Sequence, residues 1–226
     1  MINPATLPLL VWLSPSFPVG AFAFSHGLEW AVEAGDIRDA ESAKLWLADL
    51  LQHGSGTSDC CTVALAWQAA FDHDQERLRD LAELTCALQP SSERRLEATM
   101  QGQAFMLAAL SSWSRPALEV LKPALADGVT YPVALGLAAA SHEIPLAQTV
   151  SAFALSFVSN LVSALVRLGP LGQTDGQRVI AALLPLIESV SDDATKATLA
   201  DLGTCAFRSD IASMRHETQY TRLFRS

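Results

Sequence analysis

Two stretches of the sequence begin like the zinc motif His-Glu-x-x-His, in which two histidines one helical turn apart bind the metal. Residues 142–143 and 216–217 both read His-Glu. The fifth positions hold Leu146 and Tyr220, so neither stretch supplies the second histidine. The chain's five histidines are otherwise scattered, and a lone histidine is more often a hydrogen-bonding residue than a ligand. We therefore predict no metal-binding residue at these positions.

The motifs of other common catalytic sites are also missing from the sequence. It has no Gly-x-x-x-x-Gly-Lys-Ser/Thr motif for nucleotide phosphates, and Gly54-Ser55-Gly56 is not the Gly-x-Ser-x-Gly motif of a hydrolase. Cys60 and Cys61 could be soft metal ligands, but adjacent residues of a helix point about 100° apart and rarely bind one ion. With no Cys-x-x-Cys spacing, we expect free thiols in a reducing cytosol. The sequence thus favours an interaction protein over an enzyme, with no catalytic residue.

An aromatic loop near the N-terminus is the first segment that could bind a partner. An apolar run ends there at a Ser-Pro pair, and further Pro and Gly residues interrupt any regular element. Phe17, Phe22 and Phe24 lie on this stiffened loop, an arrangement that suits a docking surface. The alternative is that these side chains fill the core, as most aromatic residues do.

The C-terminal segment, residues 215–226, is opposite in charge to the rest of the chain. Three arginines against one glutamate give it a net charge of +2, whereas the whole chain carries −9. Such a tail is either a frayed end or a docking peptide. Two apolar residues between arginines favour docking, because a solvated tail gains nothing from them. The candidate binding residues of this segment are Arg215, His216, Glu217, Tyr220, Arg222, Leu223, Phe224 and Arg225.

Residues 144–166 carry no charge and are long enough to span a bilayer. Polar residues interrupt the stretch, and those at 156, 160, 163 and 167 fall on one helical stripe. A buried helix of a bundle explains this pattern better than a transmembrane helix, because no second apolar span or basic flanking loop accompanies it. We expect a structural polar network here, formed by Asn160, Arg167, Gln173, Thr174 and Asp175.

The composition limits the classes of partner. Fifteen basic against twenty-four acidic residues argue against nucleic acid and against anionic membrane surfaces. Half of the residues are hydrophobic and only 17% are charged, which indicates that some apolar surface is buried against other proteins. No basic region or cleavage site precedes the first charged residue, Glu29, so we expect no signal peptide and a cytoplasmic location.

The hydrophobic periodicity is helical almost throughout, and no alternating stretch is long enough for a sheet. Helices are expected at about 28–35, 39–53, 58–71, 75–88 and 91–112, and further ones from about 116, 132, 145, 175 and 194. With no repeat or long linker, the sequence predicts a single all-α globular domain, residues 1–226, of about nine or ten helices. We expect residues 1–8 and 215–226 to be mobile until a partner binds.

Three segments resemble the UreF family of urease accessory proteins. The first is the N-terminal loop, where residues 18–22 read Pro-Val-Gly-Ala-Phe and residues 25–29 read Ser-His-Gly-Leu-Glu. The second runs from Tyr131 to the turn at 167–177, and the third is the chain end, 210–226. The chain departs from the family pattern at Ala21, where a second glycine is usual, and at residues 23–24, where Ser and Tyr or Trp are common. The three segments occur in the same order as in the family, and together the match spans nearly the whole chain.

This resemblance implies a UreF-like accessory protein, a nickel-insertion chaperone for the urease metallocentre. The implied partners are accessory protein D (H in some organisms), the GTPase accessory protein G and apo-urease, with a homodimer in the complex. Nickel and GTP would be handled by the complex, with no cofactor bound by this chain alone. The resemblance adds Ser25, His26 and Glu29 to the candidate partner-binding residues. The alternative is a GTPase-regulating subunit that supplies an arginine in trans, either Arg222 or Arg225.

Overall fold

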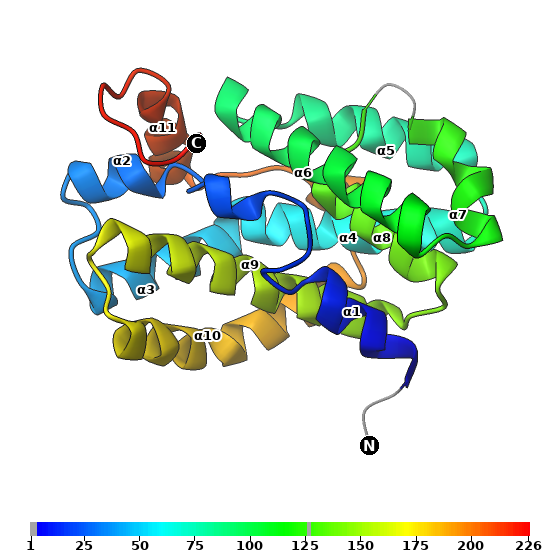
Figure 1. Cartoon of the computed structure of the whole chain (residues 1–226), viewed down its shortest axis with the longest axis horizontal. Coiled ribbons are helices and arrows are strands. Elements are labelled where there is room, and N and C mark those ends of the chain that lie inside the picture. Colours follow the sequence, from blue (N-terminus) through cyan, green and yellow to red (C-terminus); the bar gives the residue numbers. More distant parts are fainter. Residues whose placement is uncertain (1–3, 126–127) are drawn as a thin grey trace.

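A computed structural model describes residues 4–125 and 128–226. Within these ranges the chain forms helices and turns and no strand, which confirms the all-α prediction (Figure 1). The predicted mobile stretch 1–8 lies partly outside the described residues, and residues 4–8 belong to a 3₁₀ turn and the start of α1. The α-helices are α1 (Leu7–Trp12), α2 (Leu28–Glu33), α3 (Ala40–His53), α4 (Ser55–Phe71), α5 (Gln75–Ala87), α6 (Ser92–Ser112), α7 (Pro116–Leu121), α8 (Tyr131–Ser141), α9 (Leu146–Leu168), α10 (Gln173–Ala194) and α11 (Phe207–His216).

Side-chain caps begin three of the predicted helices. Asp39 accepts a hydrogen bond from the backbone N–H of Ser42 at 2.9 Å, while the Ser42 hydroxyl accepts one from the N–H of Asp39. Asp74 and Ser91 cap α5 and α6 in the same way, by accepting from a backbone N–H three residues on. These bonds satisfy donors that have no partner within the first turn of a helix, so the predicted starts of α3, α5 and α6 agree with the structure.

Two predicted boundaries are wrong. The helix expected from residue 58 begins three residues earlier, as α4, directly after Gly54. No helix begins at Ala194, which instead ends α10. The apolar period of α10 continues to this point, since Ile187, Val190 and Ala194 are all buried on one face. The next α-helix, α11, begins only at Phe207.

The centre of the fold is the pair α4 and α8 (Figure 1). Besides α8, α4 contacts α3, α5, α9 and α10, so most of its faces are buried. The two helices approach closely because glycine and alanine lie between them. A Cβ atom on Gly136 of α8 would be 2.5 Å from the carbonyl oxygen of Val63 in α4. This contact therefore requires glycine.

Helix α9 is the uncharged stretch of the sequence. By length and composition it could cross a membrane, but half of its most apolar window is buried inside the protein. It packs against α10, α4, α8 and α2. This packing agrees with the predicted buried helix of a bundle.

The loop that precedes α2 and the C-terminal segment lie together at one side of the bundle. In Figure 1, α11 and the tail that follows it lie beside α2 and near the first turns of α6. Gly27, just before α2, permits this contact, since a Cβ there would be 2.8 Å from the backbone nitrogen of Ser213 in α11. Its φ of +77° also favours glycine. The N-terminal loop and the C-terminal tail, far apart in sequence, are thus neighbours.

We predict that Gly136→Ala destabilises the protein by about 1–3 kcal/mol, because the added methyl group must push α8 away from α4. Urea unfolding followed by circular dichroism measures the loss. Gly172→Ala is the control, since a Cβ at Gly172 meets no atom within 4 Å and its φ is −81°. Equal stability of the two variants would show that the α4–α8 contact is looser than described.

Candidate functional site

The carboxylate of Glu29 joins the N-terminal loop to the C-terminal tail. Glu29 lies buried in the first turn of α2. One of its oxygens accepts a hydrogen bond from the backbone N–H of Leu223 at 2.6 Å, and the other accepts one from Phe224 at 2.9 Å. Residues 223–224 lie outside any helix, so these N–H groups need an acceptor from elsewhere in the chain. Glu29 supplies it and thereby fixes the tail against α2.

A second carboxylate holds the tail from the side of α6. His216, fully buried at the end of α11, has its Nδ1 2.6 Å from an oxygen of Glu93 and its Nε2 3.2 Å from an oxygen of Glu29. Arg222 donates to the other oxygen of Glu93 at 2.7 Å. The imidazole of His216 therefore bridges α2 and α6, and the positive charge of Arg222 is paired within the chain.

Residues 225–226 continue the contact as main-chain pairing with the loop. The N–H of Arg225 donates to the carbonyl of Ala23 at 2.8 Å, and the N–H of Ser25 donates to the carbonyl of Ser226 at 2.7 Å. The Ser226 hydroxyl donates to a Glu97 oxygen at 2.7 Å. Hydrogen bonds of this kind add the tail to the loop much as an extended peptide adds to a sheet edge.

Behind the tail lies a buried group of charged residues. Arg94 and Glu97, one turn apart on α6, form an ion pair. Burial would raise the pKa of Glu97, but the charge of Arg94 and hydrogen bonds to His26 and Ser226 hold it at about 2. Burial and Arg94 lower the pKa of His26 to about 4. A neutral His26 then shares a hydrogen bond of 2.6 Å with the hydroxyl of Ser55 at the start of α4.

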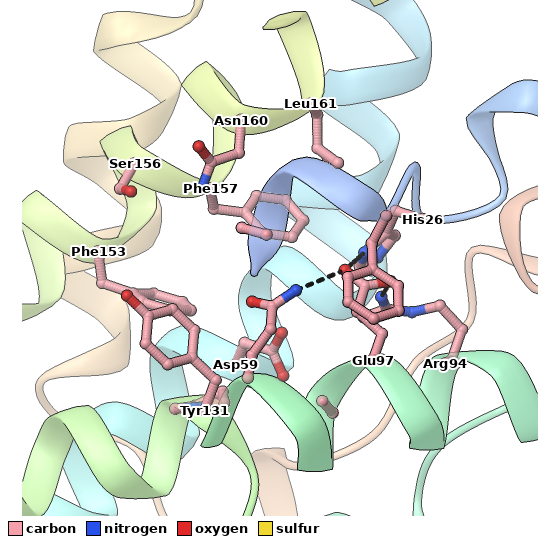
Figure 2. A pocket seen from close by; sticks show the side chains of 15 residues that line it. His26, Asp59, Arg94, Glu97, Tyr131, Phe153, Ser156, Phe157, Asn160 and Leu161 are labelled. Atoms are coloured by element: carbon pink, nitrogen blue, oxygen red, sulfur yellow. Dashed lines mark hydrogen bonds and ion pairs between the residues drawn. The ribbon is translucent and has the colours of Figure 1, made fainter. Parts of the chain in front are cut away.

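These groups line one side of a small cavity of about 60 Å³ between α4, α6, α8, α9 and the loop. Figure 2 shows His26, Arg94 and Glu97 on one side and Tyr131 on the other, with Asp59 between them. A cavity of this size with several polar side chains in its wall has room for a few water molecules. In the part of the chain that the structure describes, no hydrogen bond is made by the Asp59 carboxylate. Burial raises the pKa of Asp59 to about 7, with Arg94 opposing the shift.

The structure divides the three loop phenylalanines between the two roles that the sequence left open. Phe17 and Phe24 are buried, and the ring of Phe17 lies 5.4 Å from that of Phe105 in the core. Phe22 is 73% exposed. The core alternative therefore applies to Phe17 and Phe24, and only Phe22 presents an aromatic surface.

The candidate residues of the tail are divided in the same way. His216 and Phe224 are buried, as are Ser25, His26 and Glu29 opposite them, so these five make contacts inside the chain. Leu223 is 67% exposed. Exposed with it are Arg215, Glu217, Tyr220, Arg222 and Arg225.

The expected mobility of the tail before a partner binds stays a prediction. The structure places the tail on the body, where even the exposed Glu217 accepts from the backbone N–H of Ser92 at 2.8 Å. The sequence suggested mobility because the tail is basic on an acidic chain. Folding brings the carboxylates of Glu29 and Glu93 to these charges, so the tail has partners within the same molecule.

The predicted polar network around Asn160 and Arg167 does not form as expected. Gln173 and Thr174 are exposed, and Asp175 pairs with Arg178 on its own helix at 2.9 Å. Arg167 points instead to the N-terminal loop and donates to the carbonyl of Phe22 at 2.6 Å. Asn160 lines the cavity and makes no hydrogen bond within the described ranges. The reason is that Asp175 has a cation one turn away, whereas Arg167 lies on the face of α9 toward the loop.

Sequence reasoning missed the buried charged and polar residues of α6. Arg94, Glu97 and Gln101 are all buried, and they precede Phe105 at spacings of three and four residues. They thus occupy the register of the apolar face. Charged residues in such positions must be paired inside the protein, which is the signal that could have identified them.

Comparison with known proteins shows the family of the chain. The UreF family model matches residues 37–184, more than half of the chain. "Urease accessory protein UreF" of Rhodopseudomonas palustris (strain BisA53) is 53% identical over 218 residues, which cover 96% of this chain and 92% of that protein. The protein of the same name from Xanthobacter autotrophicus is 54% identical over 220 residues, 97% of this chain and 90% of that protein. One from Bradyrhizobium diazoefficiens is 50% identical over 218 residues, 96% and 90% of the two chains.

We predict that Glu29→Gln loosens the tail. The amide keeps the size of the side chain but loses the charge, and hydrogen bonds to a charged group contribute about 1.5–3 kcal/mol. Hydrogen exchange at the amides of Leu223 and Phe224 should therefore become about tenfold faster or more. Glu188→Gln, at an exposed position of α10, is the control. Unchanged exchange in the Glu29 variant would mean that other contacts hold the tail.

We also predict that Asp59→Asn stabilises the protein at high pH. The folded-state pKa of Asp59, about 7, is above its ordinary value of 3.8, so the folded state keeps a proton that the unfolded state has lost. Because the folded state binds this proton more tightly than the unfolded state, the protein loses stability as the pH rises from about 4 to 7. The free energy of unfolding that Asp59→Asn gains over the native chain should thus be largest above pH 7, on the order of 2 kcal/mol, and should shrink toward pH 4.

Thermal unfolding between pH 4 and 8 measures this gain. Asp80→Asn, at an exposed position of α5, is the matched control. A gain that does not change with pH would mean that Asp59 is ionised in the folded protein at neutral pH.

Proposed function

Because the chain belongs to the UreF family of urease accessory proteins, we propose that it is a nickel-insertion chaperone that scaffolds the assembly of the urease metallocentre. It binds accessory protein D or H, recruits the GTPase accessory protein G and docks with it on apo-urease. Insertion of nickel depends on GTP, which the complex handles. The chain itself has no active site in this proposal, binds no cofactor alone and works as a cytoplasmic homodimer.

The observation that carries this proposal is the high identity to proteins named as urease accessory proteins, over nearly the full length of the chain. The junction of loop and tail supports a binding role for the surface. Phe22, Tyr220 and Leu223 are exposed there, next to arginines on a chain of net charge −9. Exposed aromatic and apolar side chains beside arginines are typical of protein interfaces.

A second apolar surface supports the homodimer. Leu7, Leu10 and Val11 of α1 and Leu155 of α9 are exposed. Leu10 and Leu155 line a groove of about 400 Å³ between α1, the N-terminal loop and α9. Apolar side chains gathered in this way favour association with another protein surface. We assign this face to the second copy of the chain and the loop–tail junction to the other accessory proteins.

Co-expression tests the proposal directly. The full chain, with an affinity tag, is expressed with the D-type and G-type proteins of its own organism and purified. We expect both partners to be retained, and urease activity to appear when apo-urease, nickel and GTP are added. Purification of the chain alone, with activation unaffected by its omission, would overturn the scaffold.

The rate of GTP hydrolysis by the G-type protein separates this role from that of an arginine supplied in trans. A scaffold leaves the rate nearly unchanged, whereas an arginine finger raises it by orders of magnitude. In the structure Arg222 is paired with Glu93, so it would have to leave that carboxylate to reach another protein. A large acceleration that is lost in Arg222→Ala or Arg225→Ala would favour the second role.

We predict that Leu223→Ala weakens binding of the D-type protein about tenfold or more and leaves the melting temperature unchanged. The side chain is 67% exposed, so its loss costs little folding energy, whereas an apolar anchor at an interface contributes about 2 kcal/mol. Isothermal titration calorimetry measures the affinity. Leu45→Ala, an exposed leucine of α3, is the control. Equal affinities of the two variants would exclude the tail as an anchor.

A further inference from the structure

Arg167 contacts both the N-terminal loop and the C-terminal tail. It lies in the last turn of α9. Its guanidinium carbon is 3.7 Å from the centre of the Phe22 ring and 4.3 Å from the centre of the Phe224 ring. One of its nitrogens donates to the carbonyl of Phe22 at 2.6 Å, and Nε donates to the carbonyl of Ser163 at 3.4 Å. One side chain thus connects three segments that are far apart in sequence.

The charge of Arg167 is balanced without a carboxylate. Throughout residues 4–125 and 128–226, no acidic side chain lies within ion-pair distance of it. Its position at the C-terminus of α9 is favourable for a cation, because the helix dipole is negative there. Water reaches this partly buried side chain, and the faces of the two rings and the carbonyl of Phe22 stabilise it further. Phe22 and Phe224 are therefore contacts on which the placement of this guanidinium depends.

No ring contact joins Phe22 directly to Phe224 in the described residues, so the guanidinium links these two side chains. This link adds to the main-chain hydrogen bonds between Ala23 and Arg225 and between Ser25 and Ser226. Removal of either ring leaves the cation with less compensation and with more freedom to move away from the other ring. Coupling of this kind is reciprocal: whatever displaces the loop weakens the tail, and whatever displaces the tail weakens the loop.

We propose that Arg167 is a positioning residue that couples the loop carrying Phe22 to the C-terminal tail. A protein that binds at Phe22 thereby changes the stability of the docked tail, and a protein that takes up the tail changes the loop. The physical link does not depend on who the partners are. Its use in ordered recruitment rests on the proposed function, in which the two surfaces receive accessory proteins.

The chemistry requires arginine. A guanidinium is planar, stacks on aromatic faces and still offers N–H groups in its plane to the Phe22 carbonyl. Lysine keeps the charge but has no plane to stack, so Arg167→Lys separates the coupling from simple electrostatics. Phe22 is the matching site on the loop, because its exposed side chain can be changed with little effect on the core.

Hydrogen exchange on the isolated full chain tests the coupling. Phe22→Ala should speed exchange at the amides of Leu223, Phe224 and Arg225 about fivefold, although Phe22 makes no hydrogen bond to them. Phe22→Tyr keeps the ring and should restore slow exchange, whereas Phe22→Leu should behave like the alanine variant. Amides of α4 and α8 report whether the core is intact.

The double variant supplies the decisive comparison. In an Arg167→Lys background, where the tail already exchanges faster, Phe22→Ala should add nothing further. Arg178→Lys, which alters an exposed pair on α10, is the control background and should keep the full effect of Phe22→Ala. The proposed coupling is wrong if Phe22→Ala does not change the exchange rates of the tail amides in the native background. It is also wrong if Phe22→Ala changes these rates equally in the Arg167→Lys and Arg178→Lys backgrounds. The single Phe22 variants decide this even if Arg167→Lys does not fold.

Binding of the accessory proteins is then measured separately for the native chain and for Phe22→Ala. If Phe22→Ala speeds exchange of the tail amides but the native chain binds neither accessory protein, the proposed function is refuted and the coupling stands. Binding with uncoupled exchange would refute the role of Arg167 and leave the scaffold.

Discussion

The arrangement of the N-terminal loop and the C-terminal tail depends on the hydrogen bonds of the buried Glu29 carboxylate. The carboxylate accepts the backbone N–H groups of Leu223 and Phe224 and lies 3.2 Å from His216. A buried acceptor of this kind is costly to leave unpaired, so loop and tail stabilise each other. The geometry of the exposed surface, with Phe22 on one segment and Leu223 on the other, follows from that mutual dependence.

The interior behind this contact is polar where a bundle is ordinarily apolar. Arg94, Glu97 and His26 are buried within the first turns of α6 and the N-terminal loop, and Asp59 faces the same cavity. The mutual attraction of such groups must first offset the loss of water on burial. Removal of one member of the Arg94–Glu97 pair would leave the other charge buried without a partner. The intact pair therefore holds the loop through His26 and holds residue 226 through Glu97.

The frame that holds these groups in place is apolar and closely packed. Helices α4 and α8 meet through glycine and alanine, with Gly136 against the backbone of α4. Because packed helices do not deform continuously, Asp59 on α4 and Tyr131 on α8 keep their places around the cavity. The loop and tail, by contrast, are held by hydrogen bonds at the edge of this frame, where segments open most easily.

The sequence by itself determined the fold class, most helix starts and the resemblance to UreF. These depend on short-range chemistry, such as the caps at Asp39, Asp74 and Ser91 and the 3.6-residue period of apolar positions. It also identified both the loop and the tail as unusual segments. Only the tertiary structure decided that they meet, that Phe24 and Phe224 are buried while Phe22 and Leu223 are exposed, and that Arg167 pairs with the loop rather than with the turn at 173–175. Those outcomes rest on contacts between residues more than a hundred positions apart, and no local pattern records which distant carboxylate or ring will be within reach once the helices have packed.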